Sequence, residues 1–333
     1  MNPLKNLIFF MFKHHQKTHE LLKEILTILN EVSRKLSKYS ETKVIDTNLS
    51  DESSLFFVPP GHFYSPVPSN EDIAKWQNLQ VRQEKEKILE IPGIDLKTHQ
   101  QMNLLSLLQE FYEDLPFTAQ KQLDLRFFYE NPAYSYSDSI FLYFMIRHFQ
   151  PNHIIEVGSG YSSCAMLDIN EIYFNGSIKT TFIEPYPDLL FSLIKEQDKP
   201  HIDIHCKKLQ EIELSLFSNL NENDILFIDS THILKLNSDV NYIFSSILPC
   251  LQKGVLIHFH DIFYPFEYPE AWIRENRAWN EIYTLRSFLQ YNNSFEIIIF
   301  NTYLEYLYPN FFEANMPLCL KNPGGSIWIR KTQ

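Results

Sequence analysis

The sequence predicts an α/β fold in which a doubly wound parallel sheet carries helices on both faces. Three observations support this fold. From residue 138 onward, short apolar runs of strand length alternate with segments of helical length, which is the pattern of parallel strands joined by helical crossovers. The run at 153–157 passes directly into a Gly158-Ser159-Gly160 turn. Other runs end in acidic or imidazole side chains, at the edge where such sheets bind ligands.

The expected elements follow in chain order. Runs rich in Ile, Val and Phe predict strands, and the longer stretches between them predict helices. Strands are expected at 153–157, 179–183, 202–206, 225–228, 255–259, 295–300 and 326–330, and helices at 138–148, 162–173, 189–197, 239–251 and 276–291. Two or three further helical stretches are expected within 71–125. Residues 302–324 form an insertion between the last two strands, to which the sequence assigns no role.

Composition excludes several classes of protein. The chain has 333 residues, of which 44% are hydrophobic, so wholesale disorder is excluded. A net charge of −12 disfavours nucleic acid as the main partner. The four cysteines are widely spaced without a C-x-x-C pair, which disfavours a zinc ribbon or disulfide framework and fits a reducing compartment. No apolar run approaches the ~18 residues of a membrane span, so we expect a soluble cytoplasmic protein without a transmembrane segment.

The N-terminal part divides into a helical arm, residues 1–50, and an accessory helical and proline-rich segment, residues 51–125. Apolar residues at 3-4 spacing in the arm indicate a coiled-coil seam: Leu22, Ile25, Leu29, Val32 and Leu36. The seam predicts a homo-oligomer; membrane-surface contact and packing on the chain's own domain are the alternatives. Residues 58–69 contain four prolines, which prevent a regular helix or central strand. We expect this stretch to lie extended, either over the mouth of a site or in a groove.

The glycine turn and the acids around it predict a nucleoside ligand. Glycines allow the backbone to approach a ligand closely, but the third glycine of the dinucleotide fingerprint is absent. Glu156, just before the turn, is unfavourable for a pyrophosphate and suits a cationic ligand. Glu184 ends the next strand, where an acid accepts ribose hydroxyls; the other interpretation is an exposed strand-end glutamate.

These residues resemble the class I S-adenosylmethionine-dependent methyltransferases. The resemblance is carried by Glu-Val-Gly-Ser-Gly at 156–160, the acid Glu184, Phe-Ile-Asp-Ser-Thr-His at 227–232 and the stretch 254–261. It covers 126–333, which it implies to be the methyltransferase domain, with a Rossmann-like seven-stranded sheet that ends in an antiparallel hairpin. Within the class, the chain is most similar to a bacterial group assigned to sugar or small-metabolite modification, also through 60–65 and 279–281.

The resemblance implies a site for S-adenosylmethionine, residue by residue. Glu156, Gly158 and Gly160 would line the methionine and ribose parts. Ser159, Tyr161 and Ser162 would lie near the amino acid end, and Glu184 would hold the ribose diol. Gln210, with Lys208 and Leu209, would lie near the adenine, and Asp229 completes the cofactor-binding set.

A second group of residues suggests a metal. Asp229 follows one strand and His260-Asp261 follow the next, so the three side chains are expected to converge. Two carboxylates and an imidazole suit Mg²⁺ or Mn²⁺. The alternative is that the acids cap turns and that His258 or His260 is a core histidine. The arrangement is similar to catechol O-methyltransferase-like enzymes, in which an Asp-Asn pair stands in place of His260-Asp261, so a metal-free His/Asp pair stays open.

The predicted catalytic residues are His232, Asp229 and His260. His232 stands where those enzymes have a lysine, and a histidine is suited to be the general base for a hydroxyl. The resemblance therefore implies an enzyme of class EC 2.1.1.- that methylates a hydroxyl of a small metabolite or sugar. Assistance by a divalent metal and a metal-free site are both open. Alternatives are N-methylation of an amino sugar and a catalytically silent cofactor-binding scaffold that oligomerises through its arm. A nicotinamide dehydrogenase is disfavoured by the missing glycine.

The aromatic loop at 262–272 follows this predicted site directly. We expect it to be a wall or lid of the acceptor site, or else a packed surface loop. Arg274 and Arg277 lie just after it, where they would contact an acidic group of the substrate or pair with Glu275 and Glu281.

Overall fold

The computed structural model describes residues 57–86 and 90–333, and Pro60–Gln333 form one compact unit. The predicted N-terminal arm lies outside the described residues, so its coiled coil and the homo-oligomer stay predictions. In the stretches that are described, no helix combines the length and apolar character needed to cross a membrane.

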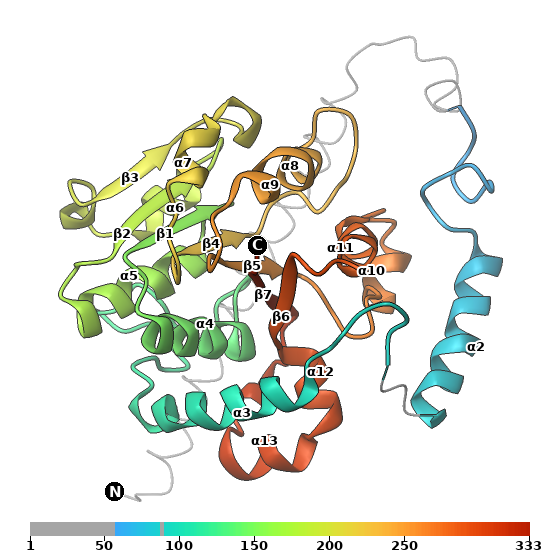
Figure 1. Ribbon diagram of the computed structural model, residues 1–333, viewed down its shortest axis with the longest axis horizontal. Coiled ribbons are helices and arrows are strands. Elements are labelled where there is room, and N and C mark those ends of the chain that lie inside the picture. Colours follow the sequence, from blue (N-terminus) through green and yellow to red (C-terminus); the bar gives the residue numbers. More distant parts are fainter. Residues whose placement is uncertain (1–56, 87–89) are drawn as a thin grey trace, which may run out of the picture. The chain divides into compact units, whose positions relative to one another are not determined.

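A seven-stranded sheet forms the centre of this unit (Figure 1), in the order β3-β2-β1-β4-β5-β7-β6. Its strands are β1 (His153–Val157), β2 (Lys179–Ile183), β3 (Ile202–His205), β4 (Ile225–Ile228), β5 (Leu256–His260), β6 (Phe295–Phe300) and β7 (Ser326–Lys331). The first five strands pair in parallel, whereas β7 runs antiparallel to both of its neighbours. The expected Rossmann-like doubly wound sheet with its terminal hairpin is confirmed.

Helices and short helical turns fill the connections. Before the sheet come α2 (Asn70–Glu86), α3 (Thr98–Leu108), the 3-10 turn η2 (Gln109–Asp114) and α4 (Tyr136–Phe149). Between β1 and β5 lie α5 (Tyr161–Phe174), α6 (Asp188–Leu193), η3 (Glu196–Asp198), η4 (Leu209–Glu211), α7 (Leu214–Ser218), α8 (Asp239–Tyr242), η5 (Ile243–Ile247) and α9 (Leu248–Cys250). The C-terminal part adds α10 (Glu270–Arg274), α11 (Glu281–Leu289), α12 (Asn301–Leu307), α13 (Pro309–Asn315) and η6 (Cys319–Lys321).

The strand order places the topological switch point, where sheets of this kind bind ligands, between β1 and β4. The chain runs outward from β1 to β3 and then returns to β4 on the other side of β1. Because parallel crossovers are right-handed, the two halves place their helices on opposite faces, and a crevice opens where the direction reverses. The strands that border this crevice are wholly buried beyond their first residue, so apolar packing on both faces fixes the positions of their ends.

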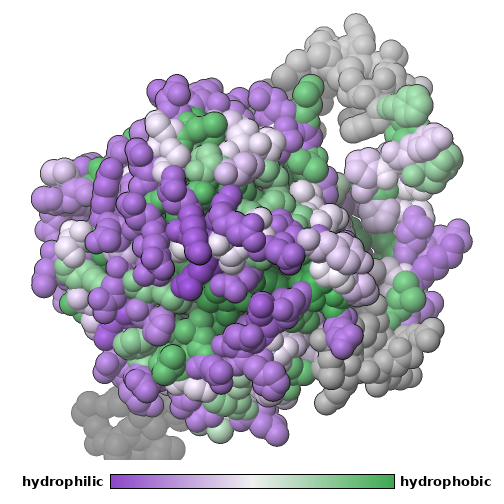
Figure 2. Space-filling model, in the orientation of Figure 1, coloured by the Kyte–Doolittle hydropathy of each residue, from purple (hydrophilic) through white to green (hydrophobic). Residues whose placement is uncertain are grey.

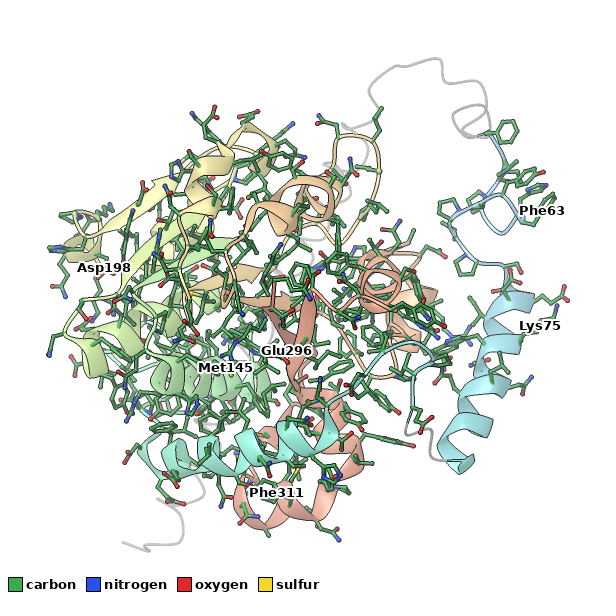
Figure 3. The ribbon with its side chains drawn as sticks, viewed as in Figure 1. Phe63, Lys75, Met145, Asp198, Glu296 and Phe311 are labelled. Atoms are coloured by element: carbon green, nitrogen blue, oxygen red, sulfur yellow. The ribbon has the colours of Figure 1, made fainter. Side chains whose placement is uncertain are left out.

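The exterior contrasts with this core. Hydrophilic residues cover most of the face shown in Figure 2, and hydrophobic residues show mainly in a strip across its middle. In Figure 3, Phe63 and Lys75 point outward from the proline-rich stretch and from α2, and the phenyl ring of Phe63 is 79% exposed.

The C-terminal connections differ most from the expected elements. A helix was expected over 276–291, but α11 begins only at Glu281 because Asn276 and Ala278 adopt left-handed backbone conformations. The preceding loop, expected to be irregular, contains the short helix α10. The insertion at 302–324 folds into α12, α13 and η6, and α12 packs against β6 and β7.

Two other helices are interrupted. The expected helix at 239–251 has a π-helical stretch at η5, followed by Pro249, which has no backbone N–H for a regular helical hydrogen bond. The expected helix at 189–197 ends at Leu193. Beyond Leu193, Asp198 accepts a hydrogen bond from the backbone N–H of Lys195 and pairs with Arg126. In this segment a tertiary ion pair therefore fixes the chain in place of further helical hydrogen bonds.

Arg126 connects the chain before α4 to α5 and to the turn before β3 through ion pairs. Its side chain is 3% exposed and pairs with Asp168 at 2.6 Å, with Glu171 at 2.7 Å and with Asp198. The backbone N–H groups of Arg126 and Phe127 also donate to Asp168. One guanidinium thus balances carboxylates from α5 and from the turn before β3.

We expect Arg126→Ala to lower the free energy of unfolding by about 3–5 kcal/mol, because Asp168 and Asp198 would remain buried without their cation. The control is Lys199→Ala, which breaks an exposed pair with Glu196 and should change the free energy of unfolding far less. Urea unfolding followed by circular dichroism measures both variants. Equal losses would show that the cluster contributes no more than a surface pair.

Candidate active site

The candidate site lies at the carboxyl ends of β1, β2, β4 and β5, on the crevice described above. Two backbone hydrogen bonds hold the ends of β1, β2 and β4 together. The N–H of Gly158 donates to the carbonyl of Ile183 at 3.0 Å, and the N–H of Asp229 donates to the carbonyl of Val157 at 2.9 Å. A Cβ on Gly158 would lie 1.7 Å from the carbonyl oxygen of Asp229. With its φ of +83°, Gly158 is therefore required both for its conformation and for its lack of a side chain.

The remaining turn residues support the turn itself. Ser162 donates to Glu156 at 2.5 Å, and Ser163 also donates to it. Burial raises the pKa of Glu156 to about 8, although these two hydrogen bonds partly offset the effect. The N–H of Gly160 donates to the hydroxyl of Ser163 at 3.0 Å, and the ring of Tyr161 packs edge-on against the ring of Phe128.

A cavity of about 380 Å³ opens beside the turn. Four of the predicted cofactor residues line it, namely Gly158, Glu184, Gln210 and Asp229. Five others are not among its lining residues, namely Glu156, Ser159, Gly160, Tyr161 and Ser162. Sequence reasoning missed the far wall, which comes from the loop between β4 and α8 and includes Thr231, Lys235, Asn237, Ser238 and Asp239. No spacing pattern in that loop signalled a ligand.

Two of the predicted residues that line this cavity are held in place by hydrogen bonds. The carboxylate of Glu184 accepts hydrogen bonds from the backbone N–H groups of Ser159 at 3.2 Å and Tyr186 at 2.8 Å, so its orientation is set by the backbone. The side-chain amide of Gln210 donates to the carbonyl of Asn237 at 2.7 Å. Both side chains are thus ordered before any ligand binds.

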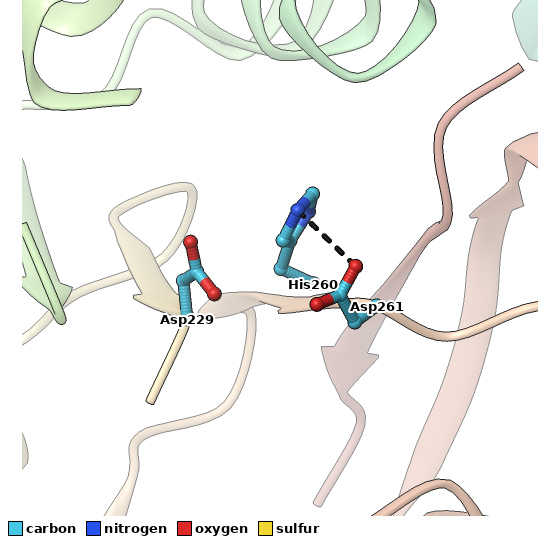
Figure 4. Close-up of side chains that lie close together, drawn as sticks. All are labelled: Asp229, His260 and Asp261. Atoms are coloured by element: carbon cyan, nitrogen blue, oxygen red, sulfur yellow. Dashed lines mark ion pairs between the residues drawn. The ribbon is translucent and has the colours of Figure 1, made fainter. Parts of the chain in front are cut away.

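The predicted metal residues do converge. Figure 4 shows Asp229, at the end of β4, facing His260 and Asp261 at the end of β5. One ligand atom from each residue lies within 4.8 Å of the others, and His260 Nε2 lies 3.5 Å from Asp261 Oδ1. Two carboxylate oxygens and an imidazole nitrogen at this spacing suit an oxygen-preferring divalent ion.

His232 lies against the same two acids. Its Nε2 is 3.5 Å from Asp229 Oδ1 and 3.4 Å from Asp261 Oδ2. Its Nδ1 lies 2.8 Å from Oε2 of Glu281, a buried carboxylate on α11. The carbonyl of His232 also accepts the N–H groups of Asn280 and Glu281. Sequence reasoning did not place Glu281 in the site, and its signal in the sequence was the Trp-Asn-Glu run at 279–281.

Electrostatics in this cluster are dominated by the negative charge of Glu281, which is buried, and of Asp229 and Asp261, which are partly buried. Burial disfavours a charged His232, but Asp229, Glu281 and Asp261 outweigh it and raise the pKa of His232 to about 10. Burial would raise the pKa of Asp229, but the imidazoles of His260 and His232 reverse this and lower it. Burial also raises the pKa of Asp261. The ligand-free site therefore favours a protonated His232 between carboxylates.

The other histidine of β5 is a core residue. His258 is fully buried and stacks on Phe227 at 4.0 Å between ring centroids, with Trp328 at 4.7 Å. Burial lowers its pKa well below the ordinary value, and His260 lowers it further. His258 is therefore neutral and contributes packing, whereas His260, two residues along the strand, reaches the acids at the site.

The two arginines after the aromatic loop pair with nearby glutamates. Arg274 Nε lies 2.7 Å from Glu270 and Arg277 Nη2 lies 2.7 Å from Glu275. Pairing of Arg277 with Glu275 was one of the two interpretations open from the sequence. Neither guanidinium is thus an unpaired anion receptor.

A known protein family and one protein of known sequence match parts of this chain. A family described as "Methyltransferase domain" matches residues 155–262. An uncharacterized protein of Archaeoglobus fulgidus is 33% identical over 171 residues, which are 50% of this chain and 75% of that protein.

Two solved structures also match. The methyltransferase PaMTH1 of Podospora anserina, bound to SAH, is 14% identical with a TM-score of 0.38 and covers 81% of this chain and 99% of its own. The O-methyltransferase TomG of Streptomyces achromogenes, in complex with SAM, is 14% identical with a TM-score of 0.39 and covers 79% and 99%.

We expect Gly158→Ala to destabilise the fold much more than Gly176→Ala. Both glycines have positive φ, but a Cβ on Gly176 would meet nothing within 4 Å. Gly176→Ala therefore incurs only the conformational cost of about 1–2 kcal/mol, while Gly158→Ala also forces the Asp229 carbonyl aside. Urea unfolding of the two variants measures the difference. Equal losses would mean that the close contact with Asp229 carries no cost.

Proposed function

We propose that this chain, which belongs to the class I S-adenosylmethionine-dependent methyltransferases, transfers the methyl group to a hydroxyl of a small molecule. The observation that carries the proposal is the position of one acid. Asp229 lines the cavity beside the glycine turn and also faces His232. A group able to handle a proton thus stands directly beside the predicted cofactor site.

The cavity residues fit S-adenosylmethionine. Gly158 lines the cavity with its backbone alone, because a Cβ there would lie 1.7 Å from the carbonyl oxygen of Asp229. The Oγ of Ser159, the next residue of the turn, is buried without a hydrogen-bond partner within the described parts of the chain. Glu184 keeps its carboxylate beside the cavity for the ribose diol, and Gln210 lines the adenine end. The negative charge of Asp229 suits the cationic sulfonium. When bound, the cofactor supplies a methyl group that is already activated for transfer.

What the protein must add is alignment and removal of a proton. Proximity and orientation of the acceptor oxygen supply much of the rate. We assign proton removal to Nε2 of the neutral form of His232, which is the minor form at neutral pH because the pKa is about 10. Nδ1 is not available for this role because it is hydrogen-bonded to Glu281, which fixes the ring. Acids on both sides stabilise the imidazolium that results. Glu281 is a positioning residue in this scheme, since it acts through His232.

Asp229, His260 and Asp261 also fit a divalent ion, through two oxygens and one nitrogen that lie close together. Such an ion would offset the negative charge that keeps His232 protonated and would lower the pKa of an acceptor hydroxyl. The site thus favours O-methylation, which requires loss of a proton from the acceptor.

Glu184→Ala is expected to abolish micromolar binding of S-adenosylmethionine, because the ribose hydroxyls lose their acceptor. Calorimetric titration measures this in the full chain, in buffer with Mg²⁺ and in buffer with a chelator. A matched control is Glu196→Ala, an exposed acid outside the cavity, which should bind normally. Tighter binding with Mg²⁺ than with chelator would support a metal at the site. No binding by the unaltered chain in either buffer would remove the cofactor assignment.

His232→Ala is expected to lower turnover at least about a hundredfold, the usual contribution of a general base, while the affinity for S-adenosylmethionine barely changes. Formation of S-adenosylhomocysteine with an accepted hydroxyl compound measures turnover. Glu281→Gln keeps a hydrogen-bond partner for Nδ1 without the charge, so we expect a smaller loss. Unchanged turnover in His232→Ala would exclude this residue from the mechanism.

A further inference from the structure

We propose that the methyl acceptor is held through a flat apolar ring system, in a second cavity walled by Trp76, Trp272 and Trp279. The proposal rests on the methyl transfer proposed above and names the chemical class of its acceptor. It also assigns a function to the proline-rich stretch and α2, which lie outside the matched methyltransferase domain.

The second cavity has a volume of about 220 Å³ and is built from two separate parts of the chain. Pro66, Pro68, Ile73 and Trp76 come from the proline-rich stretch and α2, and Tyr268, Trp272 and Trp279 come from the region between β5 and α11. An apolar cavity of about 150 Å³ holds a benzene molecule. This cavity therefore has room for one ring or a fused pair of rings.

The cavity lies next to the proposed catalytic residues. Trp279, one of its walls, packs against His232 with ring centroids 4.5 Å apart. Asp229, which lines the cofactor cavity, also lies beside His232. His232 is therefore in contact with the lining of both cavities, as required of a residue that acts on an acceptor bound in one and a methyl group held in the other.

The charged side chains of the wall are already engaged. Arg277 stacks on Trp272 and Trp279, with its guanidinium carbon 4.3 Å and 4.8 Å from the two ring centroids, and pairs with Glu275. Asp72 accepts hydrogen bonds from the N–H and hydroxyl of Ser69. These contacts fix the tryptophan rings and the start of α2.

The hydroxyl groups of the wall are engaged too. Tyr268 accepts the N–H of Ile282 at 3.2 Å, and Tyr283 donates to Glu267 at 3.1 Å. A sugar needs a partner for each hydroxyl that it buries, and burying unpaired polar groups is costly. An aryl ring needs none, and it gains stacking and apolar contact with tryptophan. The wall therefore favours an aryl hydroxyl compound over a sugar.

The contact between the two parts of the wall is specific. The side-chain amide of Gln77, next to Trp76, donates to Glu270 of α10 at 2.7 Å. Lys75, on the other side of Trp76, points outward (Figure 3) and pairs with Glu71 on its own helix. Trp76 and Lys75 are adjacent in sequence and opposite in environment, which supplies a matched pair of variants.

The test uses 2-naphthol as a flat ring with one hydroxyl and methyl glucoside as a polyol. Calorimetric titration of the full chain, saturated with S-adenosylhomocysteine, measures the Kd of each probe. We expect 2-naphthol to bind more tightly than the glucoside. Trp76→Ala should raise the Kd for 2-naphthol at least about tenfold by loss of ring contact, Trp76→Phe should restore most of the affinity, and Lys75→Ala should have no effect.

Tighter binding of the glucoside, or equal affinity for 2-naphthol in Trp76→Ala and the unaltered chain, would overturn the ring site. Incubation with S-adenosylmethionine separates this failure from failure of the proposed reaction. Methyl transfer to the glucoside without binding of 2-naphthol would leave hydroxyl methylation standing and exclude the ring site. Binding of 2-naphthol that depends on Trp76, without transfer to any hydroxyl probe, would support the ring site and contradict hydroxyl methylation.

Discussion

The contact between Gly158 and the backbone of Asp229 is the constraint on which the rest of the site depends. It brings the turn after β1 so close to the end of β4 that no side chain fits between them. The cofactor cavity opens beside this contact, and the side chain of Asp229 leaves it toward His232. The same few backbone atoms, which are held by the buried ends of β1 and β4, would therefore position both the proposed cofactor binding and the proposed proton transfer.

Buried negative charge is the second organising feature. Three carboxylates surround His232, and Asp261 is shared with His260. Carboxylates buried without partners would be very costly, so the two imidazoles offset part of that cost in the ligand-free protein. A site with this excess of negative charge is suited to accept a proton or a divalent cation. Glu281, at the start of α11, connects His232 to the C-terminal half of the domain.

The proposed acceptor wall comes from elsewhere in the chain. Strand ends of the sheet supply the turn, the acids and the histidines, whereas Trp76 comes from α2 and Trp272 from α10. In this arrangement, changes in the wall alter the acceptor without disturbing the cofactor site. The aromatic loop after β5, for which a wall or a packed loop were both open, packs through Tyr268 and Trp272 around Trp279 and thus lies beside His232.

Local sequence was enough to predict the sheet. The strands β1, β2 and β4 have the predicted bounds, because short runs rich in β-branched and other apolar residues between polar turns favour buried strands. It also singled out Asp229, His260 and Asp261, since parallel strands bring their ends to one edge. Contacts between distant residues were beyond its reach. Three features depend on how separate segments pack: the pairing of His232 with Glu281, 49 positions later, the end of α6 at the Arg126 cluster, and the cavity shared by Trp76 and Trp272. Packing between distant segments produces no periodic pattern in the sequence, so these features could not be predicted from it.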